Sequence, residues 1–270
     1  MEKCVICGCV RNCEQYIEKV FENISKIQTI FKQSKIIMSF DNSTDGSLEK
    51  LRQLKTKFDM EIIINRNPIT NNRTVDIERA RNKILDLIYN KYSLFDYFIM
   101  IDMDDVCSKP IYIESLINGL NNKNKWDGLF FNNKNYYDFW ALSFDDFEFS
   151  CWHSNNNRKL INLMNEALKG KFNEEFVECL SAFGGFGIYK IDKFIGCKYR
   201  SLIDLYLFDI NKINLVNEKY NIKYVLNKDI YDCEHRYFHL NAIKKNKVTL
   251  RICKDYLFPP YIGVHTNVLD

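Results

Sequence analysis

Short apolar runs in the first hundred residues each end in a polar cluster and are followed by apolar positions at helical spacing. Such runs predict buried strands, and the spacing that follows them predicts amphipathic helices. The predicted strands cover residues 3–10, 35–40, 60–64 and the run that ends at Asp102, and the predicted helices cover 16–27, 48–54 and 75–89. Strands that alternate with helices are typical of a largely parallel sheet covered by helices, which is an α/β fold.

Polar side chains follow three of these predicted strands. Asp41 and Asp45 come after the second strand, Arg66 after the third, and the run Asp102–Asp105 after the fourth. Ligands of parallel α/β sheets bind beyond the carboxyl ends of the strands. We therefore expect these side chains to line one ligand-binding edge.

The fourth predicted strand ends in three carboxylates within four residues, Asp102, Asp104 and Asp105. Carboxylates crowded at a sheet edge repel one another unless a cation neutralises them. Hard divalent cations prefer oxygen ligands, and such an ion also holds a diphosphate. The sequence therefore predicts a divalent cation here, although a solvated acidic turn that begins the next helix has the same composition.

The second half of the chain is less regular. It contains a predicted helix at 160–168, an aromatic segment at 136–142 and a glycine-rich segment at 183–190, with strand-like runs at 126–131 and 247–253. No linker, repeat or low-complexity segment separates the two halves. We expect a single domain over residues 1–270.

Composition narrows the class of protein. The 270 residues are 46% hydrophobic, 27% charged and 14% aromatic with a net charge of +3, which argues against disorder and gives no electrostatic reason to expect nucleic acid. No apolar run is long enough for a membrane span, and the N-terminus lacks the pattern of a secretory signal. The ten cysteines are then expected to be reduced thiols, and the expected location is the cytoplasm.

Several residues have both a functional and a structural interpretation. His235, between Glu234 and Arg236, suits a third metal ligand beside carboxylates, with His265 as second choice, but a single histidine is also often a structural residue. Gly184 and Gly185 permit either a tight bend or the close approach of a sugar to the backbone.

Two arginines and four cysteines also have both a functional and a structural interpretation. Arg81 and Arg11 can contact a diphosphate at the sheet edge, or Arg81 can pair with neighbouring acids as a surface charge. Four cysteines suggest zinc, but they fall within one predicted strand and the loop after it, so buried thiols fit better. These cysteines are Cys4, Cys7, Cys9 and Cys13.

The order of the motifs resembles that of GT-A glycosyltransferases. The motifs are Arg-Asn at 11–12, Asp-Asn-Ser-Thr-Asp-Gly-Ser at 41–47, Ala-Arg-Asn at 80–82, Asp-Met-Asp at 102–104, Tyr-Tyr-Asp at 136–138, Trp-Ala-Leu at 140–142, Phe-Gly-Gly at 183–185 and Cys-Glu-His at 233–235. The series is most similar to the family of the cryptococcal capsule-associated protein and its α-1,3-mannosyltransferase relatives, and to glycosyltransferases of large DNA viruses.

This resemblance implies a GT-A (Rossmann-like) domain with a mixed, mainly parallel sheet, a nucleotide-binding half at 1–107 and a sugar- and acceptor-binding half at 108–270. It implies Mn²⁺ or Mg²⁺ held by Asp102, Asp104, Asp105 and His235, with the direct carboxylate ligand left open. Asp104 and Asp138 are the expected catalytic residues. The residues expected to contact the donor are Arg11, Asp41, Asp45, Arg66, Arg81, Asp102, Gly184 and Gly185.

The implied function is transfer of a sugar from a GDP- or UDP-sugar to a hydroxyl of a glycan acceptor. Two alternatives stay open. A sugar nucleotidyltransferase also combines carboxylates with a cation, but it usually carries a glycine-rich loop after the first strand, which Cys7–Arg11 does not provide. A catalytically silent module that binds a glycan or a partner is the second alternative.

Overall fold

The computed structural model describes residues 2–67, 69–133, 136–227 and 230–260. Its strands are β1 Lys3–Val10, β2 Gln33–Phe40, β3 Met60–Ile64, β4 Tyr97–Ile101, β5 Gly128–Asn132, β6 Phe176–Cys179, β7 Phe186–Lys190 and β8 Leu250–Tyr256. Its α-helices are α1 Glu14–Gln28, α2 Ser47–Lys55, α3 Arg73–Lys91, α4 Ile113–Asn121, α5 Asn157–Lys171, α6 Ile191–Phe194, α7 Ile210–Tyr220 and α8 Glu234–Asn246.

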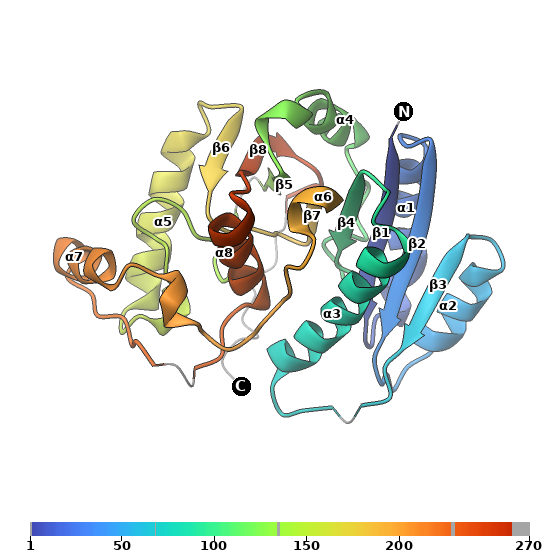
Figure 1. Cartoon of the computed structure of the whole chain (residues 1–270), viewed down its shortest axis with the longest axis horizontal. Helices are drawn as coiled ribbons and strands as arrows, with labels where there is room; N and C mark the ends of the chain where they lie inside the picture. The colour runs from blue at the N-terminus through green and yellow to red at the C-terminus, as the bar shows by residue number, and fades with distance from the viewer. Residues whose placement is uncertain (1, 68, 134–135, 228–229, 261–270) are drawn as a thin grey trace.

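The strands form one sheet in the order β3-β2-β1-β4-β7-β5-β8-β6 (Figure 1). The strands β3, β2, β1 and β4 are mutually parallel. In the other half of the strand order, β7 runs antiparallel to both of its neighbours, β4 and β5. The strands β5 and β8 are parallel, and β6 is antiparallel to β8. The predicted mixed, mainly parallel sheet is therefore confirmed, and the two halves of the chain share it because β7 pairs with β4.

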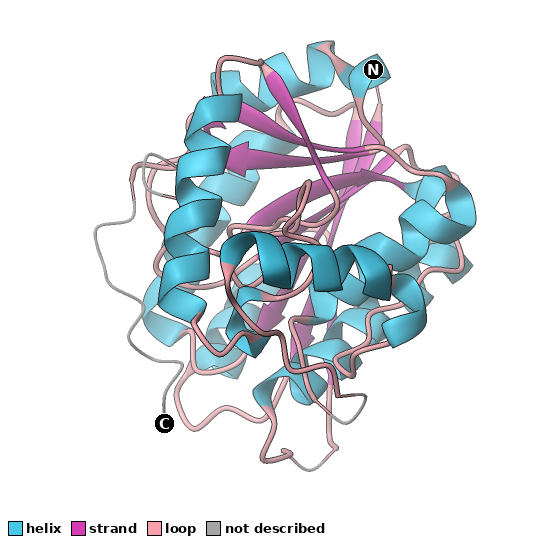
Figure 2. Ribbon diagram, turned by 90° about the vertical axis from the view of Figure 1, so that its left-hand side faces the viewer, coloured by secondary structure: helices cyan, strands magenta, loops and turns pink. Residues whose placement is uncertain are grey.

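Helices cover both faces of the sheet, as the edge-on view in Figure 2 shows. The apolar sides of α1, α2 and α4 pack into one hydrophobic cluster, and those of α3, α5, α6, α7 and α8 pack into the other. Successive residues of a strand point to opposite faces, so β1 contributes Cys4 and Ile6 to the first cluster and Val5 and Cys7 to the second. A strand that is buried on both faces needs a continuous apolar run, which is the pattern of β1.

The cysteines of β1 are packing residues. Cys4 and Cys7 are fully buried on opposite sides of the sheet, and burial raises the pKa of each thiol well above its ordinary value. All ten cysteines are free thiols. In the part of the chain that the structure describes, no three His, Cys, Asp or Glu side chains are grouped closely enough to hold a metal ion by themselves.

The first half of the chain follows its predicted elements closely, and the second half does not. Predicted strands at 3–10 and 60–64 coincide with β1 and β3. The strands β6 and β7 and the helix α8 are absent from the predicted elements, because their apolar positions follow neither regular period over enough residues. No helix among the described residues is both long and apolar enough to span a membrane.

Arg236 anchors the first turn of α8 inside the protein. Its side chain is 1% exposed, and its Nε donates to Asp232 Oδ2 at 2.7 Å. Its Nη atoms donate to the carbonyl of Leu142 at 3.1 Å, to the carbonyl of Trp140 and to the hydroxyl of Ser143. A buried guanidinium is tolerated only when its donors are satisfied, so this residue joins α8 to the segment at 140–143.

We predict that Asp232→Asn lowers the free energy of unfolding by about 3 to 5 kcal/mol, because it leaves the buried Arg236 charge uncompensated. Burial disfavours the ionised Asp232 carboxyl, but the Arg236 charge, together with His153 and a backbone hydrogen bond, outweighs burial and holds the pKa of Asp232 below the usual range. The stabilisation is then present above the unfolded pKa of about 3.9 and is lost as the pH falls through the lower folded pKa. Urea denaturation should show that the difference in the free energy of unfolding between variant and parent is present at pH 7 and shrinks below about pH 4. A difference independent of pH would contradict the role of the Asp232 charge.

Candidate active site

Polar residues from four parallel strands meet at one edge of the sheet. The last residues of β1, β2 and β3 lie side by side in register, and β4 runs parallel to β1. Arg11, Asp41, Arg66 and Asp102 follow these strands directly or after one residue. The backbone N–H of Asp102 donates to the carbonyl of Gly185 at 2.8 Å, which ties the fourth strand end to the glycine turn. The edge predicted from the sequence therefore exists.

The three carboxylates form a tight turn after β4. Asp104 Oδ1 accepts from the Val106 N–H at 3.2 Å. Burial and the charges of Asp102 and Asp105 raise the pKa of Asp104 to about 7. Burial also raises the pKa of Asp102, although the charge of Arg81 opposes this. The carboxylate oxygens crowded in this turn fit a divalent cation whose remaining ligands come from phosphate or water.

Arg81 occupies the centre of the site. This α3 side chain is 4% exposed, and its Nη2 donates to Asp102 Oδ1 at 3.1 Å. Its Nη1 pairs with the buried carboxylate of Glu234, the first residue of α8. The guanidinium lies 4.9 Å from the ring centroid of Phe183 and 5.6 Å from that of Tyr199. The interpretation of Arg81 as a surface charge is therefore wrong, and the guanidinium lies at the sheet edge.

His235 lies next to Arg81. Its Nε2 contacts Arg81 Nη1, and its ring stacks on Phe183 with centroids 3.8 Å apart. The side chain is 2% exposed, and burial, Arg81 and His239 lower its pKa well below the usual value, so the imidazole is neutral. His235 and Asp102 contact different nitrogens of the same guanidinium. His265, the second-choice ligand, lies outside the described residues.

The other residues that were expected to contact the nucleotide-sugar donor lie in different surroundings. Asp41 is 6% exposed, and its Oδ1 accepts from the N–H of the next residue at 3.0 Å. Asp45 receives the N–H groups of Glu14 at 3.0 Å and Ser47 at 3.1 Å, so it caps the starts of α1 and α2. Arg66 is exposed and has no ion pair within the described ranges.

Arg11 joins the first strand end to α3. Its Nη1 lies 3.1 Å from Asp76 Oδ2, and Asp76 is almost completely buried in the first turn of that helix. Arg79 lies 3.8 Å from the other oxygen of Asp76. Arg11 and Arg79 therefore both contact the Asp76 carboxylate beside the sheet edge.

Asp138 and the glycine turn support each other. Asp138 Oδ2 accepts from the N–H of Gly184 at 3.0 Å, and Oδ1 accepts from the N–H of Ala141 at 3.3 Å. Gly184 and Gly185 have φ values of +63° and +85°, a region that favours glycine. A Cβ on Gly185 would lie 3.0 Å from Cys107 Sγ. The two glycines therefore make the tight bend that begins β7.

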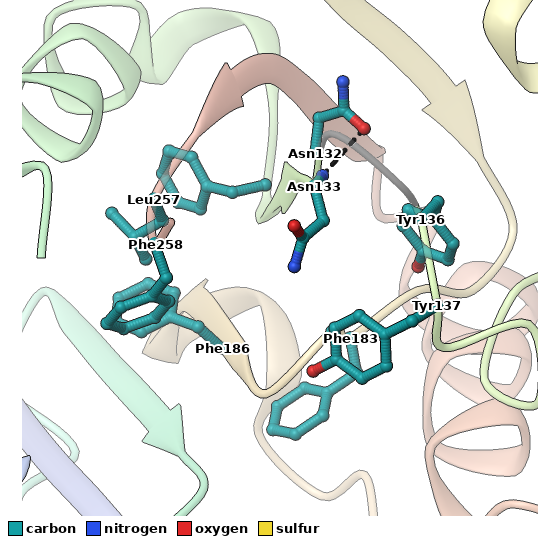
Figure 3. Close-up of a pocket in the computed structure, with 10 residues that line it drawn as sticks. Asn132, Asn133, Tyr136, Tyr137, Phe183, Phe186, Leu257 and Phe258 are labelled. Atoms are coloured by element: carbon teal, nitrogen blue, oxygen red, sulfur yellow. Dashed lines mark hydrogen bonds between the residues drawn. The ribbon is translucent and has the colours of Figure 1, made fainter. Parts of the chain in front are cut away.

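A small pocket lies beside this turn (Figure 3). Figure 3 shows Phe186, Leu257 and Phe258 on one side of the pocket, facing Tyr136 and Tyr137 on the other. Among the described residues, the lining consists of Phe131, Asn132, Asn133, Tyr136, Tyr137, Phe183, Gly184, Phe186, Leu257 and Phe258. An apolar wall with a few amide and hydroxyl groups is a common design of ligand pockets.

Sequence reasoning gave no role to Glu234 or Asp76, the two carboxylates that hold the arginines of the site. Glu234 is next to His235 in a motif already singled out, but its partner Arg81 is more than 150 residues away. Asp76 has the composition of an ordinary first-turn residue of a helix. Neither pairing leaves a spacing signal, because both depend on how distant segments pack.

Fold and site together define a GT-A type α/β protein with an acidic cluster at the carboxyl end of its fourth strand. The model of glycosyl transferase family 2 matches residues 5–172, more than half of the chain, and the chain belongs to this family. The predicted class of glycosyltransferase is thereby confirmed at the level of the family. A comparison with curated proteins finds no match, and nothing supports the capsule-associated family specifically.

The chain is also similar to solved structures at low sequence identity. TarS of S. aureus is 13% identical with a TM-score of 0.50 over 97% of this chain and 37% of its own. TarS 1–349 is 14% identical with a TM-score of 0.47 over 96% of this chain and 59% of its own. Glucosyl-3-phosphoglycerate synthase of Mycobacterium tuberculosis, in complex with Mn²⁺, UDP-glucose and glycerol 3-phosphate, is 12% identical with a TM-score of 0.47 over 97% and 73%. The chain thus spans less than two thirds of either TarS chain.

We predict that Gly185→Ala lowers the free energy of unfolding by about 1 to 3 kcal/mol, the usual cost of a residue held in a strained backbone region. The new methyl group would also press on Cys107 Sγ. The matched control is Gly170→Ala in α5, where a Cβ meets nothing within 4 Å and stabilisation of about 0.5 to 1 kcal/mol is expected. Urea denaturation of both variants checks this, and equal effects at the two positions would contradict it.

Proposed function

We propose that the protein is a divalent-cation-dependent glycosyltransferase that moves a sugar from a GDP- or UDP-sugar to a hydroxyl of a glycan acceptor. The observation that carries the proposal is the carboxylate turn after β4, where half-buried Asp104 lies beside Asp102 and Asp105, whose charges help to raise its pKa. Family membership supports the class of reaction. The buried Asp41 follows β2 at the same edge of the sheet, and we propose that it contacts the base or ribose of the donor.

In this proposal Asp104 and Asp105 hold Mn²⁺ or Mg²⁺ directly. Asp102 is already paired with Arg81, so it is placed to contact ribose or a metal-bound water. The bound cation supplies Lewis-acid stabilisation of the charge that grows on the departing nucleoside diphosphate. Arg11 and Arg66 add positive charge at the same edge, where it favours binding of that anion. His235 would reach such a cation only if the Arg81 guanidinium moved aside.

The acceptor side is proposed to begin at the glycine turn. Gly184 belongs to the lining of the aromatic pocket, and the neighbouring Gly185 carbonyl binds the Asp102 N–H. Aromatic faces beside hydroxyl and amide groups match the apolar and polar surfaces of a sugar ring. Asp138 is the proposed contact for the acceptor hydroxyl. Its two oxygens already hold the turn, so this role is combined with positioning of Gly184.

We predict that Asp104→Asn weakens Mn²⁺ binding by at least about 100-fold, since loss of an outer-shell partner alone usually costs 10- to 100-fold. The substitution keeps the shape of the side chain and removes its charge. Electron paramagnetic resonance of free Mn²⁺, with UDP or GDP present, measures the affinity. Asp192→Asn is the control, because this carboxylate is 71% exposed and only weakly paired.

Donor hydrolysis in the presence of Mn²⁺ separates the alternatives. A glycosyltransferase releases nucleoside diphosphate from a matching nucleotide sugar, whereas a nucleotidyltransferase releases pyrophosphate from a nucleoside triphosphate. A silent binding module does neither. Unchanged Mn²⁺ affinity in Asp104→Asn would exclude the proposed cation site.

A further inference from the structure

Glu234 is a buried acid that the proposed chemistry does not use. Its residue is 4% exposed, and its carboxylate pairs with Arg81 Nη1. Burial raises the pKa of this carboxyl, and the Arg81 charge offsets part of that rise. Glu234 begins α8 and lies beyond residue 172, where the family match ends.

The contacts form a chain from Glu234 through Arg81 to Asp102. Glu234 holds one terminal nitrogen of the guanidinium, and the other terminal nitrogen donates to Asp102 at 3.1 Å. The rings of Phe183 and Tyr199 lie 4.9 and 5.6 Å from the same group. A planar guanidinium held by a carboxylate and two rings presents its Nη2 to Asp102 in one direction.

Attachment of α3 to the second half of the chain does not depend on this ion pair. The amide of Asn82 forms two hydrogen bonds with the backbone of Tyr199, at 2.9 and 2.8 Å. Glu78 accepts from the N–H and the hydroxyl of Ser201 at 2.7 and 2.6 Å. A buried ion pair also adds little net stability compared with apolar packing. The Glu234–Arg81 pair therefore calls for an explanation other than joining these segments.

We propose that Glu234 is a positioning residue for the cation site, acting through Arg81 on Asp102. It holds the Arg81 guanidinium so that this group orients the Asp102 carboxylate, and it shares the guanidinium charge so that Asp102 is only partly neutralised. The carboxylate turn then keeps the orientation and the negative charge that a divalent cation needs. This inference rests on the proposed function, because it concerns the same site.

Removal of the Glu234 charge is expected to weaken cation binding. With Glu234→Gln, Arg81 keeps a single carboxylate partner and neutralises Asp102 more completely. The turn at Asp102–Asp105 then attracts a cation less strongly, and its orientation is less well defined. Both effects weaken cation binding, so they do not cancel.

The test measures Mn²⁺ affinity of the full chain by electron paramagnetic resonance, with Mn²⁺ alone and with UDP or GDP. We expect Glu234→Gln to weaken binding about 10- to 100-fold, the range usual for a partner outside the first ligand shell. The matched control is Asp127→Asn, which breaks the Asp127–Lys190 ion pair at the opposite end of the sheet, where Lys190 pairs with Tyr97 at the start of β4, and should leave Mn²⁺ affinity within about threefold. A purely structural role for Glu234 would lower the thermal unfolding temperature without changing the affinity.

A double-mutant cycle tests the route through Arg81. If Glu234 acts through that side chain, Arg81→Met combined with Glu234→Gln should bind Mn²⁺ within about threefold of Arg81→Met alone. Multiplied losses in the double variant would overturn the inference. Should Glu234→Gln fail to fold, Glu234→Asp keeps the charge on a shorter side chain that cannot hold the Arg81 guanidinium in the same place. Parent-like Mn²⁺ affinity in Glu234→Asp would then overturn the inference.

The outcomes distinguish this inference from the proposed function. Parent-like affinity in Glu234→Gln together with a loss in Asp104→Asn removes the positioning role and leaves the cation site intact. Absence of Mn²⁺ binding by the parent protein, with and without UDP or GDP, refutes the proposed function and the positioning role together. A loss in Glu234→Gln that Asp127→Asn does not share supports the positioning role.

Discussion

The buried guanidinium of Arg81 is the interaction on which the candidate site depends. A charge that is 4% exposed must be paired, and its partners Asp102 and Glu234 come from opposite halves of the chain. Docking of α8 against α3 therefore satisfies Arg81 and at the same time sets the surroundings of Asp102. The geometry of the site therefore depends on how α8 packs against α3.

The helix α8 shows how polar burial, rather than apolar burial, can place an element. Glu234 pairs with Arg81, Arg236 pairs with Asp232, and His239 lies 2.9 Å from the hydroxyl of Ser181 and 3.1 Å from that of Tyr189. Each contact satisfies a group that would be costly to bury alone. Together these contacts fix the position of α8, whose first residue pairs with Arg81 beside the carboxylate turn. Phe238 and Ala242 provide apolar packing of the same helix.

Much of the fold could be predicted because the first four strands obey simple rules. Strands buried on both faces need continuous apolar runs, and parallel strands bring their carboxyl ends to one edge, so β1 to β4 and the residues after them were placed correctly. The strands β6 and β7 were missed because antiparallel insertions into a mixed sheet carry short, irregular patterns. The helix α8 was missed because its buried face contains charged and aromatic residues, which hide the helical period.

The sequence by itself determined the acidic strand end Asp102–Asp105 and the parallel half of the sheet, since both follow from local pattern and strand geometry. Only the tertiary structure decided that Asp45 caps two helices, that Asp138 holds the glycine turn and that Arg81 joins Asp102 to Glu234. The physical reason is that these roles depend on burial and on contacts between residues far apart in the chain. Residue type gives the charge of such a group, and folding selects its partner.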